Sequence, residues 1–145
     1  MTIDRYLVDN VTLSMLTASQ KASTFMRTRC RIPEEIFHEA RGLPDIETLR
    51  PLAYPITTTV LVNVRAVLAT IKPEDKVVDL YRNEGNGDVM LLATALTEMS
   101  VSAEQLFGDR WIIATADKGL TRKAVELGVQ TCTSDEFIKL VCRFE

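Results

Sequence analysis

Residues 111–142 read WIIATADKGLTRKAVELGVQTCTSDEFIKLVC and alternate apolar runs with helix-forming segments. Apolar strands that alternate with amphipathic helices are typical of a parallel sheet covered by helices on both faces. We therefore expect an α/β protein. The elements predicted in this stretch are a buried strand over 111–115, a helix over 120–127 that ends at Gly128, a short strand over 129–132, and a helix over 134–141 that is capped at its N-terminus.

The first 110 residues continue this alternation, beginning with an apolar run over Tyr6–Val8. Asp9 follows the run directly, which indicates a strand that ends in a turn or a helix start. Pro33 precedes two glutamates, a pattern typical of a helix start, and we expect this helix to reach Arg41 and stop at Gly42. The other predicted elements are a helix over 12–25, a strand over 29–32, a helix over 58–71 with a strand left open for its first half, a helix over 73–81, and a turn at 85–87 before a helix over 88–99.

The length of 145 residues, with 46% of them hydrophobic, fits one globular domain over residues 1–145. No apolar run approaches the ~18 residues of a membrane helix. Residues 1–5 carry two charges and no apolar run, so no secretory signal is expected. Cys30, Cys132 and Cys142 lack metal-ligand spacing and fit reduced thiols, which favours the cytoplasm.

The charge balance excludes some functions and leaves others open. Seventeen basic and twenty acidic residues give a net charge of −3, which argues against a non-specific nucleic-acid binding module. Metal ions can still neutralise a carboxylate-lined nuclease site. The single histidine, His38, lies within a predicted helix, so no Ser-His-Asp arrangement is expected. The glycines at 85 and 87 lack the flanking residues of a phosphate-binding loop.

Acidic residues lie where an α/β sheet collects its ligands. Asp9 directly follows the first strand, Asp117 comes two residues after the strand over 111–115, and Asp88 begins a helix. Glu35 and Glu39 are four residues apart, so both can face the same way on a helix. Ligands of parallel sheets bind beyond the carboxyl ends of the strands. Because Mg²⁺ prefers oxygen ligands, these acids predict a divalent-metal site that acts on phosphate groups.

Four blocks of sequence, in this order and at this spacing, resemble the PIN-domain family: LVDN at 7–10, IPEEIFHEA at 32–40, GNGDVMLLATA at 85–95 and IATADKGL at 113–120. The resemblance implies a three-layer α/β/α fold. It also implies that Asp9, Glu39, Asp88 and Asp117 hold Mg²⁺ or Mn²⁺, with the Thr115 hydroxyl beside them, and that the protein cuts RNA. Small PIN domains of this length are most often VapC-type toxins, which implies an antitoxin partner, a homodimer and a cytoplasmic location.

Other interpretations of the same residues stay open. Asp9 could be a turn residue, Asp88 a helix-start charge and Asp117 an N-cap, although capping is compatible with metal binding. Glu34 and Glu35 compete with Glu39 for the fourth position. PIN domains usually carry a polar side chain two positions after the first acid, where this chain has Val11. The alternative function is therefore a catalytically weak or inactive PIN-like domain that binds RNA or serves assembly.

Overall fold

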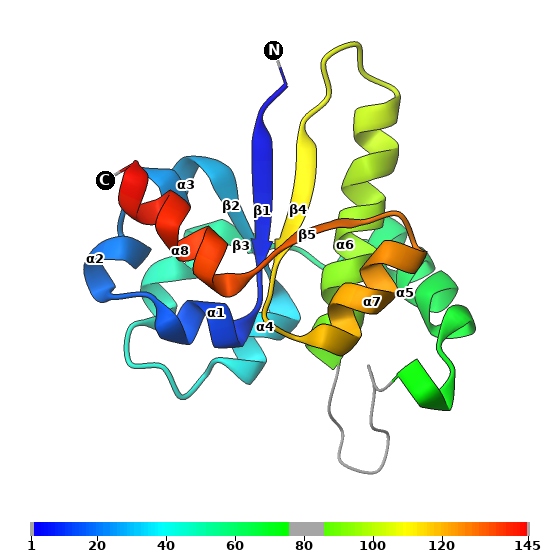
Figure 1. The fold of residues 1–145 in the computed structure, drawn as a ribbon, viewed down its shortest axis with the longest axis horizontal. Coiled ribbons are helices and arrows are strands. Elements are labelled where there is room, and N and C mark those ends of the chain that lie inside the picture. The colour runs from blue at the N-terminus through cyan, green and yellow to red at the C-terminus, as the bar shows by residue number, and fades with distance from the viewer. Residues whose placement is uncertain (1, 76–85, 145) are drawn as a thin grey trace.

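The computed structural model describes residues 2–75 and 86–144, and within them five strands form one sheet. The strand order is β3-β2-β1-β4-β5, so β1 lies at the centre (Figure 1). Every strand pair is parallel, which confirms the expected α/β class with a parallel central sheet. The strands are β1 Asp4–Val8, β2 Cys30–Pro33, β3 Ala53–Tyr54, β4 Arg110–Ala114 and β5 Gln130–Cys132.

Helices cover both faces of this sheet, and their bounds are α1 Asn10–Met15, α2 Ala18–Lys21, α3 Thr24–Arg29, α4 Glu34–Glu39, α5 Thr58–Thr70, α6 Asn86–Ala103, α7 Lys118–Glu126 and α8 Ser134–Arg143. On one face, the Tyr6 ring packs against Phe25 of α3 and Phe137 of α8. Leu7 alternates to the other face, where α6 packs against β1, β2 and β4. The fold is thus a three-layer α/β/α arrangement. None of the helices in the described ranges is long and apolar enough to cross a membrane.

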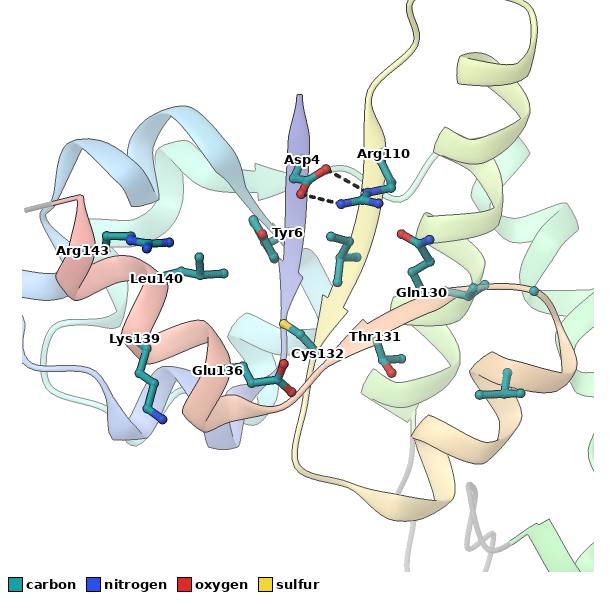
Figure 2. Close-up of a pocket in the computed structure, with 14 residues that line it drawn as sticks. Asp4, Tyr6, Arg110, Gln130, Thr131, Cys132, Glu136, Lys139, Leu140 and Arg143 are labelled. Carbon is teal, nitrogen blue, oxygen red and sulfur yellow. Dashed lines mark hydrogen bonds and ion pairs between the residues drawn. The ribbon is translucent and has the colours of Figure 1, made fainter. Parts of the chain in front are cut away.

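The register of β1 and β4 sets what lies at the two ends of the sheet. Asp4 lies opposite Arg110, and their side chains form a bidentate ion pair at the amino-terminal end (Figure 2). Val8 lies opposite Ala114 at the carboxyl end. The residues that follow these two strands therefore leave the sheet side by side, which is where α/β proteins place their ligands.

The single helix predicted over 12–25 is wrong, because the segment forms three short helices, α1, α2 and α3. Each has its own side-chain cap at the N-terminus: Asp9 accepts from the backbone N–H of Thr12, Thr17 from that of Gln20, and Ser23 from that of Met26. Side-chain oxygens of Asp, Thr and Ser compete with the helical backbone for these N–H groups. The closely spaced caps divide the segment.

Other boundaries also differ from the predictions. Helix α4 ends at Glu39, short of Gly42, and Pro33 is the last residue of β2 and the N-cap of the helix. Residues 58–70 are helical throughout, so the strand alternative is wrong. Residues 86 and 87 begin α6, where a turn was expected. Of the helix predicted over 73–81, residues 73–75 form the 3₁₀ helix η2, Pro73–Asp75, and the remainder lies outside the described residues.

The second half of the chain matches its prediction closely. Strand β4, helix α7, strand β5 and helix α8 follow one another in the expected order. Gly128 has φ 76°, the left-handed conformation that a helix C-terminus requires and that glycine adopts without strain. The 3₁₀ helix η1, Ile46–Leu52, and the two-residue strand β3 were not predicted.

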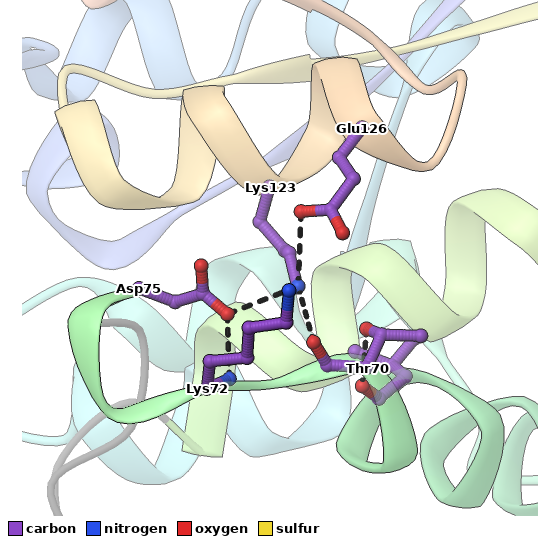
Figure 3. Close-up of polar contacts among 6 residues, drawn as sticks. Thr70, Lys72, Asp75, Lys123 and Glu126 are labelled. Atoms are coloured by element: carbon purple, nitrogen blue, oxygen red, sulfur yellow. Dashed lines mark hydrogen bonds and ion pairs between the residues drawn. The ribbon is translucent and has the colours of Figure 1, made fainter.

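One fully buried charge, Lys123 of α7, joins α7 to the end of α5. Its side chain is 1% exposed, and Nζ donates to the Thr70 carbonyl oxygen at 2.6 Å (Figure 3). The same ammonium group forms ion pairs with Asp75 and Glu126, both at 3.0 Å. Asp75 also accepts from the backbone N–H of Lys72 at 2.6 Å. This cluster fixes α7, whose N-terminus carries Asp117, against the end of α5 and against η2.

Replacing Lys123 with alanine is expected to lower the free energy of unfolding by about 2 kcal/mol, because Asp75 and the Thr70 carbonyl would lose a buried partner. Urea denaturation followed by circular dichroism measures this change. Lys118→Ala, at an exposed position on the same helix, is the matched control and should change stability by less than about 0.5 kcal/mol. Equal effects of the two substitutions would contradict the role of the cluster.

Candidate functional site

Asp9 lies at the carboxyl end of β1 with 5% of its surface exposed. One carboxylate oxygen, Oδ1, accepts from the backbone N–H of Thr12 at 2.8 Å and caps α1. The other, Oδ2, accepts from the Thr115 hydroxyl at 2.6 Å. The turn-residue interpretation of Asp9 is thus correct as far as capping goes, but the contact to Thr115 also ties this carboxylate to the end of β4.

Thr115 and Asp117 continue this connection along the edge of the sheet. The Thr115 hydroxyl oxygen accepts from the backbone N–H of Asp117 at 3.0 Å while its hydrogen goes to Asp9. Asp117 is the N-cap of α7, and its Oδ1 accepts from the backbone N–H of Leu120 at 2.8 Å. Its Oδ2 has no hydrogen-bond partner among the described residues. Capping therefore leaves one oxygen of Asp117 available for a ligand.

Glu39 is the acid of α4 that reaches the N-terminus of α6. Its Oε1 accepts from the backbone N–H of Gly87 at 2.9 Å. A Cβ atom at position 87 would come within 2.6 Å of both carboxylate oxygens, so only glycine allows this approach. Glu34 is exposed at the start of the same helix and forms no hydrogen bond or ion pair with a described residue of α6. Glu35 also lies near the start of α6, where it lines a hollow with Asn86 and Val89, but Glu39 is the acid that accepts a hydrogen bond from Gly87, next to Asp88.

The pKa of Asp88, in the first turn of α6, is affected by burial and by the charges of the three other acids. Burial, followed by the negative charges of Asp117, Glu39 and Asp9, raises the pKa of Asp88 to about 7. Burial also raises the pKa of Glu39, although its hydrogen bond from Gly87 opposes the change. These effects place Asp117, Glu39 and Asp9 in the neighbourhood of Asp88.

No ion pair compensates this negative charge within the described residues, although the charge of His38 opposes the rise in the pKa of Glu39. The ion pairs there involve other acids, and none joins Asp9, Glu39, Asp88 or Asp117 to a lysine or arginine. Asp9 is buried and Asp88 half-buried, and buried carboxylates without a cationic partner are costly in free energy, whereas Glu39 and Asp117 are exposed. A bound divalent cation is the chemical species that would remove this cost.

The donor set suits one kind of metal ion. Over residues 2–75 and 86–144, no three acid, histidine or cysteine side chains stand in positions to hold a metal ion jointly. Mg²⁺ usually takes only one or two carboxylates directly and keeps several waters. All four groups offer hard oxygen donors, and among the other three acids Asp117 has the largest effect on the pKa of Asp88. Their donor chemistry fits a hydrated Mg²⁺ or Mn²⁺, which one or two of them would hold directly and the others through water.

Thr12 supports this region from the first turn of α1. It is fully buried, and its hydroxyl lies 2.7 Å from that of Ser134 and donates to the Ala114 carbonyl at 3.3 Å. Its backbone N–H holds Asp9. Val11, by contrast, is 53% exposed and holds nothing at the site. An N-cap side chain accepts from the backbone N–H two or three residues later, and Thr12 is three residues after Asp9. This spacing was the sequence signal that could have predicted the contact between them.

Comparisons of the chain with models of known families and with curated proteins find no match. Evidence for a function therefore comes from the residues and their geometry.

Proposed function

We propose that this protein is a Mg²⁺- or Mn²⁺-dependent ribonuclease that hydrolyses RNA phosphodiester bonds without a covalent intermediate. The observation that carries the proposal is the gathering of four carboxylates from four elements at the carboxyl end of β1 and β4, without a lysine or arginine partner in the described residues. The resemblance of the four sequence blocks to PIN domains supports the same function.

Each residue has a stated part in this proposal. A divalent cation bound here would lower the pKa of a water and stabilise the charge that develops on the phosphate. Asp88 and Asp117 would hold the cation, and Asp9 is kept in place by hydrogen bonds from the Thr12 backbone N–H and the Thr115 hydroxyl. Glu39, held by Gly87, orients the attacking water. The RNA phosphate would supply further oxygen ligands.

The biological setting follows from the resemblance to VapC-type toxins. We propose a toxin of a toxin–antitoxin pair, with an antitoxin protein as partner and a homodimer as the working form. The three cysteines are free thiols, one of them exposed, which supports action in the reducing cytoplasm. A gene for a small protein of antitoxin size directly before this one is the observation that would support the pairing.

One observation favours the alternative of a weak or inactive PIN-like module that binds RNA or serves assembly. Val11 places an exposed apolar side chain in the hollow beside Glu39, where PIN domains usually carry a polar group. A nuclease assay on mixed RNA, with Mn²⁺ and with EDTA, separates the two functions. Cleavage that requires Mn²⁺ supports the nuclease, and RNA binding without cleavage supports the alternative.

Replacing Glu39 with glutamine is expected to reduce Mn²⁺-dependent RNA cleavage at least tenfold, because the amide can keep a contact with Gly87 but no longer carries the charge that orients water. Initial cleavage rates on a fluorescent RNA measure the loss. Glu34→Gln, which removes the same charge from the exposed start of α4, is the matched control and should retain most of the activity. A larger loss of activity in Glu34→Gln than in Glu39→Gln would show that Glu39 is not the fourth acid of the site.

A further inference from the structure

A second hollow lies apart from the four acids, on the sheet face over β1, β4 and β5. It is a cleft of about 930 Å³, and none of Asp9, Glu39, Asp88 or Asp117 lines it. Its floor follows from the strand register, because Tyr6 lies opposite Ile112 and Ile112 lies opposite Gln130. Figure 2 shows it open between α8 on one side and the segment from α7 to β5 on the other. The volume is within the range of small-molecule sites, ~300–1,000 Å³.

Tyr6 places a hydrogen-bond donor in the floor of this cleft. The residue is 6% exposed, and Phe25 and Phe137 hold its ring at centroid distances of 5.7 and 5.5 Å. Its hydroxyl has no hydrogen-bond partner among the described residues, and since no fully enclosed side-chain oxygen there is unpartnered, this hydroxyl reaches the open space of the cleft. Burial raises the pKa of Tyr6, so the phenol stays neutral and able to donate.

The charges around the cleft favour an anion. Asp4 holds Arg110 through two hydrogen bonds of 2.9 and 2.8 Å. Glu136 is engaged at the capped start of α8. Lys139 and Arg143, one turn apart on α8, form no ion pair with a described residue. Three cations against two acids leave the lining positive, whereas the four-acid site is negative.

We propose that this cleft binds a small organic anion with an apolar body. The negative group of the ligand lies beside Arg143, and an oxygen atom of the ligand accepts a hydrogen bond from the Tyr6 hydroxyl. Figure 2 shows Arg143 and Leu140 pointing from α8 toward Tyr6, so the charge and the apolar wall face the same space. Ile112 and Leu140 provide the apolar contact that distinguishes such a ligand from an inorganic anion. This site is independent of the proposed nuclease activity.

The test uses 8-anilinonaphthalene-1-sulfonate, an aromatic sulfonate whose fluorescence rises on binding. The folded protein should bind one equivalent saturably. Arg143→Gln should weaken binding at least fivefold and Tyr6→Phe, which removes only a hydroxyl, about threefold. Arg122→Gln removes a charge from an exposed position outside the cleft and should change nothing. N-phenyl-1-naphthylamine, the same body without the sulfonate, should bind more weakly and ignore Arg143→Gln.

NMR measurement of amide chemical shifts locates the binding site of the sulfonate. The sulfonate should move the amide signals of Gln130 and Thr131 on β5 and leave those of Gly87 and Asp88 in place. Non-saturating binding, equal effects of Arg143→Gln and Arg122→Gln, or shifts centred on Asp88 would each overturn the proposal. Thermal unfolding of every variant confirms that the fluorescence comes from folded protein, because loosely packed states also bind this dye.

Discussion

Asp117→Asn is expected to reduce Mn²⁺-dependent RNA cleavage by a factor of about 10² to 10³ and to weaken Mn²⁺ binding at least tenfold. Asparagine caps helices about as well as aspartate, so Oδ1 can still accept from the Leu120 N–H at the start of α7. What the substitution removes is the negative charge on Oδ2, the oxygen left available for the cation. Titration calorimetry with Mn²⁺ and single-turnover cleavage rates measure the two effects.

The matched control for this prediction removes one charge far from the site. Glu104 follows α6 at the end opposite to Asp88, and Glu104→Gln should leave both Mn²⁺ binding and cleavage unchanged. Unchanged thermal stability of Asp117→Asn would show that its cap is intact. If both variants bind Mn²⁺ as weakly and as non-specifically as the wild type, Asp117 is only a helix cap and the metal site does not exist as drawn.

The sequence pattern predicted the central strands because they are buried on both faces. Such strands appear as continuous apolar runs, as over Tyr6–Val8 and residues 111–114. Strand β3 was missed because two residues, Ala53 and Tyr54, are too short for any periodicity. It forms only through its pairing with Ile32 and Pro33 of β2. Tertiary contacts of this kind leave no local signal.

The candidate site was predictable to the extent that its residues follow strands. Asp9 and Asp117 come after β1 and β4, and parallel neighbours end at the same edge. The contact between Glu39 and Gly87 joins residues 48 apart, and the contact between Thr12 and Ser134 joins residues 122 apart. Neither follows from spacing along the chain. The choice of Glu39 over Glu34 therefore came from the family resemblance. The physical reason for favouring Glu39, its hydrogen bond from Gly87, is visible only in the fold.

The four acids also have a consequence for stability that depends on pH. The pKa of Asp88 is about 7 in the folded protein and 3.8 in the reference state, so between these values the folded state binds a proton that the unfolded state does not. The contribution of Asp88 to the free energy of unfolding is therefore highest below about pH 4 and falls as the pH rises to about 7. Since each pKa unit corresponds to ~1.4 kcal/mol and Asp88 keeps part of its hydration, the loss is on the order of 3 kcal/mol.

Asp88→Asn removes this titration, so in EDTA the variant should be more stable than the wild type at pH 8, by on the order of 3 kcal/mol, and the difference should shrink toward pH 4. Urea denaturation at several pH values between 4 and 8 measures the difference. Adding Mn²⁺ at pH 7.5 should stabilise the wild type more than the variant, because the ion binds the folded site that contains the charge. A variant that is less stable at pH 8, or a difference that does not change with pH, would mean that neither burial nor the charges of Asp117, Glu39 and Asp9 raise the pKa of Asp88.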